Sequence, residues 1–136
     1  MKKTAAALAL FVLLIGCKKA IENKKEDLLI KAMTDGQWVV TSFVNNGNTV
    51  TTDFANYKFQ YYSDKTVDAI KNGLVDNTGT WDGDISSRTT WANFNNVSNP
   101  LSLINGSWHI DDNSWTFVVA SQTVNGQTKV MRLDKL

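Results

Sequence analysis

The segment Tyr-Lys-Phe-Gln-Tyr-Tyr at residues 57–62 decides the fold class, because large apolar and polar side chains alternate along it. Successive side chains of a β-strand point to opposite faces, so Tyr57, Phe59 and Tyr61 share one face of this strand. A Ser-Asp turn signal follows, and residues 66–70 form a second short run rich in β-branched side chains. We therefore expect two antiparallel strands whose aromatic face points into a core.

The same pattern continues through the rest of the chain. Asn-Gly pairs beginning at residues 46, 72 and 125 favour tight hairpin turns, and the acidic clusters at 82–84 and 111–113 predict two further reversals. Consecutive antiparallel strands joined in this way can close into a ring without exposed edges. We therefore expect an all-β fold, an eight-stranded antiparallel up-and-down barrel, with strands near residues 38–44, 57–62, 66–70, 78–81, 88–94, 107–110, 115–121 and 128–134.

Two segments outside the strands are expected to cover the ends of this barrel. Residues 25–33 predict a short helix, because acidic residues occupy its first turn, apolar residues recur at near-helical spacing, and Gly36 follows its end. Residues 95–106 include Asn99-Pro100-Leu101, which is typical of a helix start. We expect the two segments to lie at opposite ends.

Alternation also predicts which side chains point inward in the later strands. Trp108 and Ile110 should face the core, while His109 between them should face solvent. Residues 115–121 are apolar on both faces, so their inward set stays open.

The amino-terminal region carries a separate signal. Lys2 and Lys3 precede an uncharged run over residues 5–15, which is shorter than the roughly 20 apolar residues needed to span a bilayer. The run closes with Leu14-Ile15-Gly16 before Cys17, the only cysteine. This ending resembles the lipobox of bacterial lipoproteins, although Ile15 is larger than the residue usual at that place. The alternative is an ordinary buried or free thiol in an exported chain.

The lipoprotein resemblance implies a division of the chain and a location. Residues 1–16 would be a cleaved signal peptide, residues 17–25 a tether acylated at Cys17, and residues 26–136 the barrel domain. Acyl chains would hold the protein in the cell envelope. Lys18 stands where an aspartate retains many such proteins at the inner membrane, so we expect the outer membrane.

The charge balance argues against nucleic acid as a partner. Removing residues 1–16 takes away two of the 14 basic residues and none of the 13 acidic residues, which leaves a formal charge of −1. A nucleic-acid-binding domain typically carries a strong basic excess. The lysines at positions 18, 19, 24 and 25 could instead face anionic lipid head groups or belong to a solvated tether.

Gly36-Gln37-Trp38, placed after a short helix and before an eight-strand meander, resembles the Gly-x-Trp motif of the lipocalin-like domains found in small Gram-negative lipoproteins. That resemblance implies that Trp38 packs at the closed base of the barrel beneath a cation from the last strand, which Arg132 could supply. Gly79-Thr80-Trp81 and the closing residues 131–136 add weaker local similarity. The domain is shorter than full lipocalins, which implies a shallow cup.

Groupings of catalytic residues are missing from the sequence. His109 is the only histidine, no glycine-rich phosphate loop follows a strand, and Asp82/Asp84 and Asp111/Asp112 fit turns better than a calcium loop. We therefore expect neither an enzyme nor a bound metal or cofactor.

Aromatic residues are the remaining functional candidates. Each of the five tryptophans can bury about 150 to 250 Å² of surface, enough to fill a small barrel or to line a cavity within it. One hypothesis is a binding protein for a small apolar or amphipathic ligand. The alternative is a filled barrel that acts as an envelope adaptor, accessory protein or inhibitor through exposed aromatics such as Tyr62 or Trp115. For the first hypothesis, the expected cup-lining residues are Tyr57, Phe59, Trp81, Trp91 and Phe117.

Overall fold

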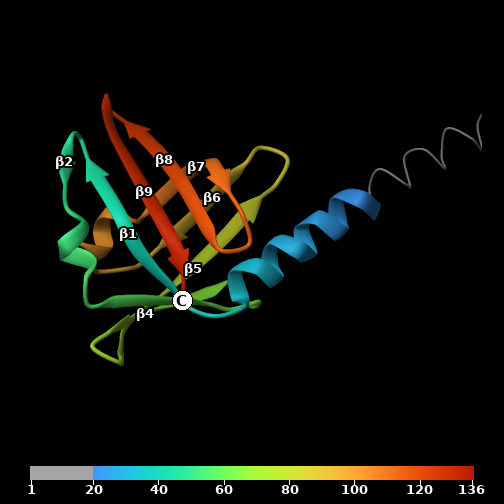
Figure 1. Ribbon diagram of the computed structural model, residues 1–136, viewed down its shortest axis with the longest axis horizontal. Helices are drawn as coiled ribbons and strands as arrows, with labels where there is room; N and C mark the ends of the chain where they lie inside the picture. Colours follow the sequence, from blue (N-terminus) through green and yellow to red (C-terminus); the bar gives the residue numbers. More distant parts are fainter. Residues whose placement is uncertain (1–19) are drawn as a thin grey trace, which may run out of the picture.

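The computed structural model of this protein describes residues 20–136, which form a closed barrel with one helix at its end (Figure 1). The expected signal peptide at residues 1–16, the expected acylation site Cys17 and the next two lysines lie outside the described residues. Among the residues that the structure describes, no helix is both long enough and apolar enough to cross a membrane.

The N-terminal helix covers residues 20–34 and so begins further upstream than residue 25. The first described residues are Ala-Ile-Glu-Asn-Lys, most of which favour a helix, and no glycine or proline interrupts them. Part of the expected tether, residues 20–25, is therefore helical. The helix ends before Gly36, whose φ of 85° lies in the left-handed region that suits glycine.

Eight antiparallel strands close the barrel, as the sequence predicted, and a further two-residue strand forms a short hairpin with the first of them. Each of the eight pairs with the next of the eight along the chain. The ring closes because the last strand also pairs with the first, from Trp38 opposite Lys135 to Asn45 opposite Lys129. The strands are β1 (Trp38–Asn45), β2 (Asn48–Thr49), β3 (Tyr57–Tyr61), β4 (Thr66–Lys71), β5 (Leu74–Asp84), β6 (Thr89–Asn93), β7 (Gly106–Asn113), β8 (Phe117–Val124) and β9 (Gln127–Lys135).

The two acidic clusters do not form reversals, contrary to the sequence prediction. Asp82 and Asp84 belong to β5, and β7 continues through Asp112 past a bulge that follows Ile110. Asp82 is held within its strand because it accepts a hydrogen bond from Lys65 Nζ at 2.6 Å. The chain reverses later, at residues 85–88 and 114–116. These two loops and the loop at residues 62–65 form the end of the barrel that we name the mouth.

The opposite end of the barrel is closed by aromatic packing. The rings of Phe43 and Phe54 stack with centroids 4.9 Å apart, and Trp108 meets Phe43 edge-on at 6.0 Å. Phe59 packs against Phe94 on the neighbouring side. We refer to these five residues as the aromatic stack. All are at most 2% exposed, so this half of the barrel is filled by its own side chains.

Two 3-10 turns complete the closed end. They are η1 (Thr51–Phe54) and η2 (Leu101–Leu103), and Leu101 and Ile104 bury their side chains beneath the end of the barrel. Residues 101–104 therefore cover one end and the N-terminal helix lies at the other, as expected (Figure 1).

Candidate functional site

A cavity of about 560 Å³ occupies the mouth half of the barrel. Its inner wall is formed mainly by four buried aromatic residues from four different strands: Trp38, Tyr61, Trp81 and Trp108. Ala92, Ala120, Met131 and Leu133 fill the spaces between them. The barrel is thus filled in one half and hollow in the other. At the base the aromatic stack fills the interior, whereas at the mouth the small residues Ala92 on β6 and Ala120 on β8 leave it open.

The polar groups of the three buried indoles all point to backbone carbonyls. Trp38 Nε1 donates to Met33 O at 2.9 Å, Trp81 Nε1 donates to Tyr62 O at 3.0 Å, and Trp108 Nε1 donates to Ile104 O at 2.7 Å. Their apolar ring surfaces are therefore what the cavity presents to an occupant.

The N-terminal helix forms one side of the mouth. Leu28, Leu29, Ala32 and Met33 share one helix face at i, i+4 spacing, and all four line the cavity. A Cβ atom at Gly83 would lie 3.0 Å from Leu29 Cδ2, so glycine in β5 permits this close approach of the helix. Leu28 still exposes 43% of its surface, which leaves an apolar edge at the mouth.

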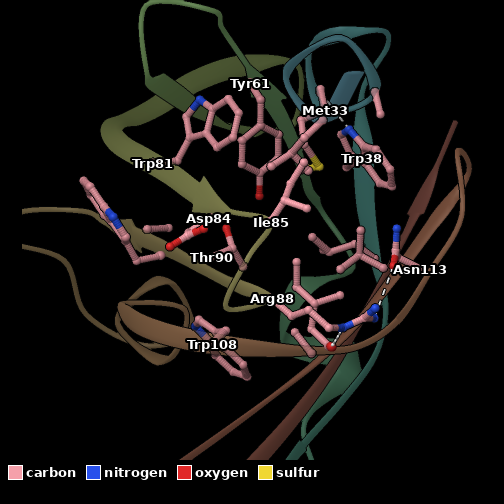
Figure 2. Close-up of a pocket in the computed structure, with 18 of the residues that line it drawn as sticks. Met33, Trp38, Tyr61, Trp81, Asp84, Ile85, Arg88, Thr90, Trp108 and Asn113 are labelled. Atoms are coloured by element: carbon pink, nitrogen blue, oxygen red, sulfur yellow. Dashed lines mark hydrogen bonds between the residues drawn. The ribbon is translucent and has the colours of Figure 1, made fainter. Parts of the chain in front are cut away.

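Two tryptophans and an arginine stand on the other side of the mouth. Trp91 on β6 is 38% exposed and Trp115 in the loop at residues 114–116 is 56% exposed, and both line the cavity. Arg88 donates from Nε to Ile110 O at 3.0 Å and from Nη2 to Asn113 Oδ1 at 3.4 Å, which ties the loop at residues 85–88 to β7 (Figure 2). Both acceptors are neutral oxygens, and Arg88 lines the edge of the cavity.

Tyr61 is the buried hydroxyl in this site. Its ring meets the Trp81 ring edge-on with centroids 5.4 Å apart, and the residue is 8% exposed. Figure 2 shows its hydroxyl directed away from the barrel wall into the cavity. Burial raises the pKa of the Tyr61 phenol above its ordinary value of 10.0, so the group stays protonated and able to donate.

The residues expected to line a cup separate into two groups. Trp81 and Trp91 line the cavity, whereas Tyr57, Phe59 and Phe117 do not. Tyr57 and Phe59 point inward as predicted, but they lie toward the closed end, where Phe59 joins the aromatic stack and the Tyr57 hydroxyl donates to Asp76 at 3.1 Å. The inward face of β3 thus contributes to both halves of the barrel. The position of a residue along the strand decides whether it packs at the closed end or lines the cavity.

Phe117 lies on the outer face of β8. The inward residues of this strand are Val118, Ala120 and Gln122, and Gln122 uses its amide to bond the backbone oxygens of Asn105 and Ser107. Because both faces of residues 117–120 are apolar, alternation alone could not choose between them.

Arg132 does not pack on Trp38, so that expectation is wrong. Its guanidinium lies 4.5 Å from the Phe117 ring on the outside of the barrel and pairs with Asp134. The cation over Trp38 is Lys135, whose Nζ is 5.1 Å from the ring centroid. Lys135 comes three positions after Arg132 in the sequence, so the two side chains lie on opposite faces of β9.

Gly36 and Trp38 join the helix to the barrel. Gly36 supplies the left-handed turn, and Trp38 is fully buried at the start of β1, where it lines the cavity. Trp38 therefore lies at the hollow half of the barrel, whereas the lipocalin resemblance implied the closed base.

Most lining residues were not singled out from the sequence as ligand contacts, and Tyr61, Met33 and Arg88 are three of them. Tyr61 shares the face of Tyr57 and Phe59 but comes last in the strand, which could have placed it at the other end. Met33 follows from the apolar helix face. Arg88 carried no signal, because its place depends on a loop with a non-glycine φ of 52°. Within residues 20–136, no cluster of three or more potential metal ligands occurs.

Comparison with known proteins supports the fold. A crystal structure of a DUF4847 family protein from Bacteroides vulgatus ATCC 8482 is similar to this chain with a TM-score of 0.55 and 15% sequence identity. The match covers 78% of this chain and 96% of that chain. Similarity at this identity shows the barrel fold alone. No family model matches the chain, and no curated protein matches it.

Proposed function

We propose that this protein is a lipid-anchored, lipocalin-like binding protein of the cell envelope that holds a small apolar or amphipathic molecule in the mouth half of its barrel. The observation that carries the proposal is the cavity of about 560 Å³ beside a fully packed closed end. Binding sites for small molecules typically measure about 300 to 1,000 Å³ and are lined mainly by apolar and aromatic side chains. The role is binding, since the lining residues form no pair of nucleophile and base.

The helix supports the proposed anchorage. An anchor at Cys17 would lie three residues before the first described helical residue, and the helix leads from there to the mouth. Residues 20–34 span about 22 Å at 1.5 Å per residue. A lipid anchor at this position would keep the mouth within reach of the bilayer, where apolar molecules concentrate. The outer membrane is the proposed location.

Filling the cavity tests ligand binding. Ala120 is 1% exposed and faces the hollow half, so Ala120→Phe should occupy part of the space and displace a fluorescent apolar probe. Val124→Phe is the matched control, because Val124 on the same strand is 54% exposed and lies away from the cavity. Saturable probe binding that Ala120→Phe abolishes and Val124→Phe retains would support the proposal. Equal binding by both variants would contradict it.

The anchor has its own test. Cys17→Ser removes the proposed acylation site and should release the protein from the membrane fraction. Membrane retention of the Cys17→Ser variant would contradict lipid attachment, whatever the result for the cavity.

A second candidate function is contact with an envelope protein, and the exposed rim favours it. Trp115, Trp91 and Leu28 expose apolar surface around one opening, and exposed aromatic residues are common anchors of protein interfaces. Native mass spectrometry of the protein purified from its own envelope separates the two functions, because a small molecule and a partner chain add very different masses.

A further inference from the structure

We infer that the cavity selects amphipathic molecules that carry a hydrogen-bond-accepting oxygen, such as a carbonyl or carboxylate, and that the hydroxyl of Tyr61 binds this oxygen. The inference rests on the proposed binding function and names the ligand chemistry of the same cavity. The observation behind it is a buried donor without a protein partner among the aromatic residues of the inner wall.

The other buried polar groups in the wall are already satisfied. The indole N–H groups of Trp38, Trp81 and Trp108 each donate to a backbone carbonyl oxygen. Thr90 is partly buried at the same cavity, and its hydroxyl donates to Asp82 O at 2.9 Å. An occupant therefore meets no free donor from these four residues.

Tyr61 differs because no residue in the described part of the chain bonds its hydroxyl. Every fully enclosed side-chain nitrogen or oxygen within residues 20–136 has a hydrogen-bond partner, so the Tyr61 oxygen is not sealed in the wall. It opens into the cavity, as Figure 2 shows. Tyr61 as a residue is nevertheless only 8% exposed. Edge-on packing against Trp81 fixes the direction of the ring.

The state of this hydroxyl decides which ligand chemistry fits. A protonated phenol donates one hydrogen bond, and leaving a buried donor without an acceptor is unfavourable. An apolar occupant that displaced water from the cavity would leave the donor unpaired. An occupant with an acceptor oxygen would pair it and still cover the indole rings with its apolar part.

The test compares three probes with the same alkyl tail: a hydrocarbon, a methyl ketone and a carboxylate. Affinities are measured for the full chain held in nanodiscs, by competition against a fluorescent apolar probe. Tyr61→Phe removes only the hydroxyl. We expect this variant to bind the ketone about fivefold to tenfold more weakly and the carboxylate more weakly still, while the hydrocarbon affinity is unchanged.

Tyr62→Phe is the matched control. Tyr62 is the next residue, is 40% exposed, and donates its hydroxyl to Asp68 on the outer face at 3.0 Å. The control should bind all three probes like the unmodified protein. Equal binding of all three probes by Tyr61→Phe and the unmodified protein would overturn the inference and leave the binding function standing. Failure of the unmodified protein to bind any probe would instead overturn the binding function.

Discussion

The indole Nε1 of Trp38 donates a hydrogen bond to the carbonyl oxygen of Met33 at 2.9 Å, and this bond fastens the last turn of the N-terminal helix to the first strand of the barrel. Carbonyl groups in the last turn of a helix have no partner within the helix. Trp38 thus satisfies one of them while its ring lines the cavity. The position of the helix beside the mouth therefore depends on a residue that also forms the wall of the site.

Trp38→Phe should destabilise the fold by about 2 to 3 kcal/mol, because it removes this hydrogen bond and part of a fully buried ring. Urea unfolding measures the change. Amide hydrogen exchange should also become faster over residues 28–34, where the helix loses its attachment. Trp115→Phe, at a site 56% exposed, should change stability by less than about 0.5 kcal/mol. Similar losses for the two variants would contradict the fastening role.

Gly79 marks a close approach between β5 and β6. A Cβ atom there would lie 2.4 Å from Asn93 O and 2.8 Å from Phe94 Cδ1, which neither the backbone nor a packed ring can accommodate. Gly79→Ala should therefore cost about 3 kcal/mol in urea unfolding. Gly83→Ala lies four residues along the same strand, and its one tight contact would be with the end of the flexible Leu29 side chain. It should therefore cost less than about 1 kcal/mol. The reverse order of the two losses would contradict the packing argument.

The ionisation of Asp82 should make the free energy of unfolding depend on pH. A hydrogen bond from Lys65 lowers the pKa of Asp82 below its ordinary value of 3.8. A carboxyl with a depressed pKa stabilises the fold above its ordinary value, and this stabilisation disappears as the pH falls through the depressed pKa. Asp82→Asn should therefore lose less of its unfolding free energy than the unmodified protein between about pH 4 and pH 2. The effect is modest because solvent screens a pair whose side chains are 34% and 42% exposed. Parallel pH profiles for the two proteins would contradict it.

Tyr61 should remain a hydrogen-bond donor through the alkaline range. Burial raises its pKa, so it should not ionise near its ordinary value of 10.0. Titration of tyrosinate absorbance should give the same curve for the unmodified protein and Tyr61→Phe up to about pH 11. A missing tyrosinate in the variant below that pH would show that water reaches the Tyr61 hydroxyl freely.

The strands of the barrel could be predicted from the sequence because successive side chains of a strand alternate between the core and the solvent. Tyr57, Phe59 and Tyr61 are all buried, and Trp108 is buried while His109 is exposed. The same rule failed for Phe117, since both faces of its strand are apolar. A different rule, that acidic clusters favour turns, failed at residues 82–84, where a hydrogen bond from Lys65 holds Asp82 in a strand.

The residues that line the cavity were harder to predict from the sequence than the strands, for a geometric reason. Alternation shows whether a side chain points inward, but it does not show how far along the barrel axis that side chain lies. Tyr57 and Tyr61 share one face and only one of them reaches the cavity. The helix contribution from Leu29 and Met33 depends on where the helix docks, which no strand pattern can encode.

The division between the aromatic stack and the cavity has an evolutionary consequence. Trp108 is the one described residue that belongs to both. If the cavity binds a ligand as proposed, replacements around the opening would alter which molecules it accepts while the packed base keeps the scaffold intact. Under that proposal, specificity would diverge through changes at a few rim positions, without compensating changes in the packed base.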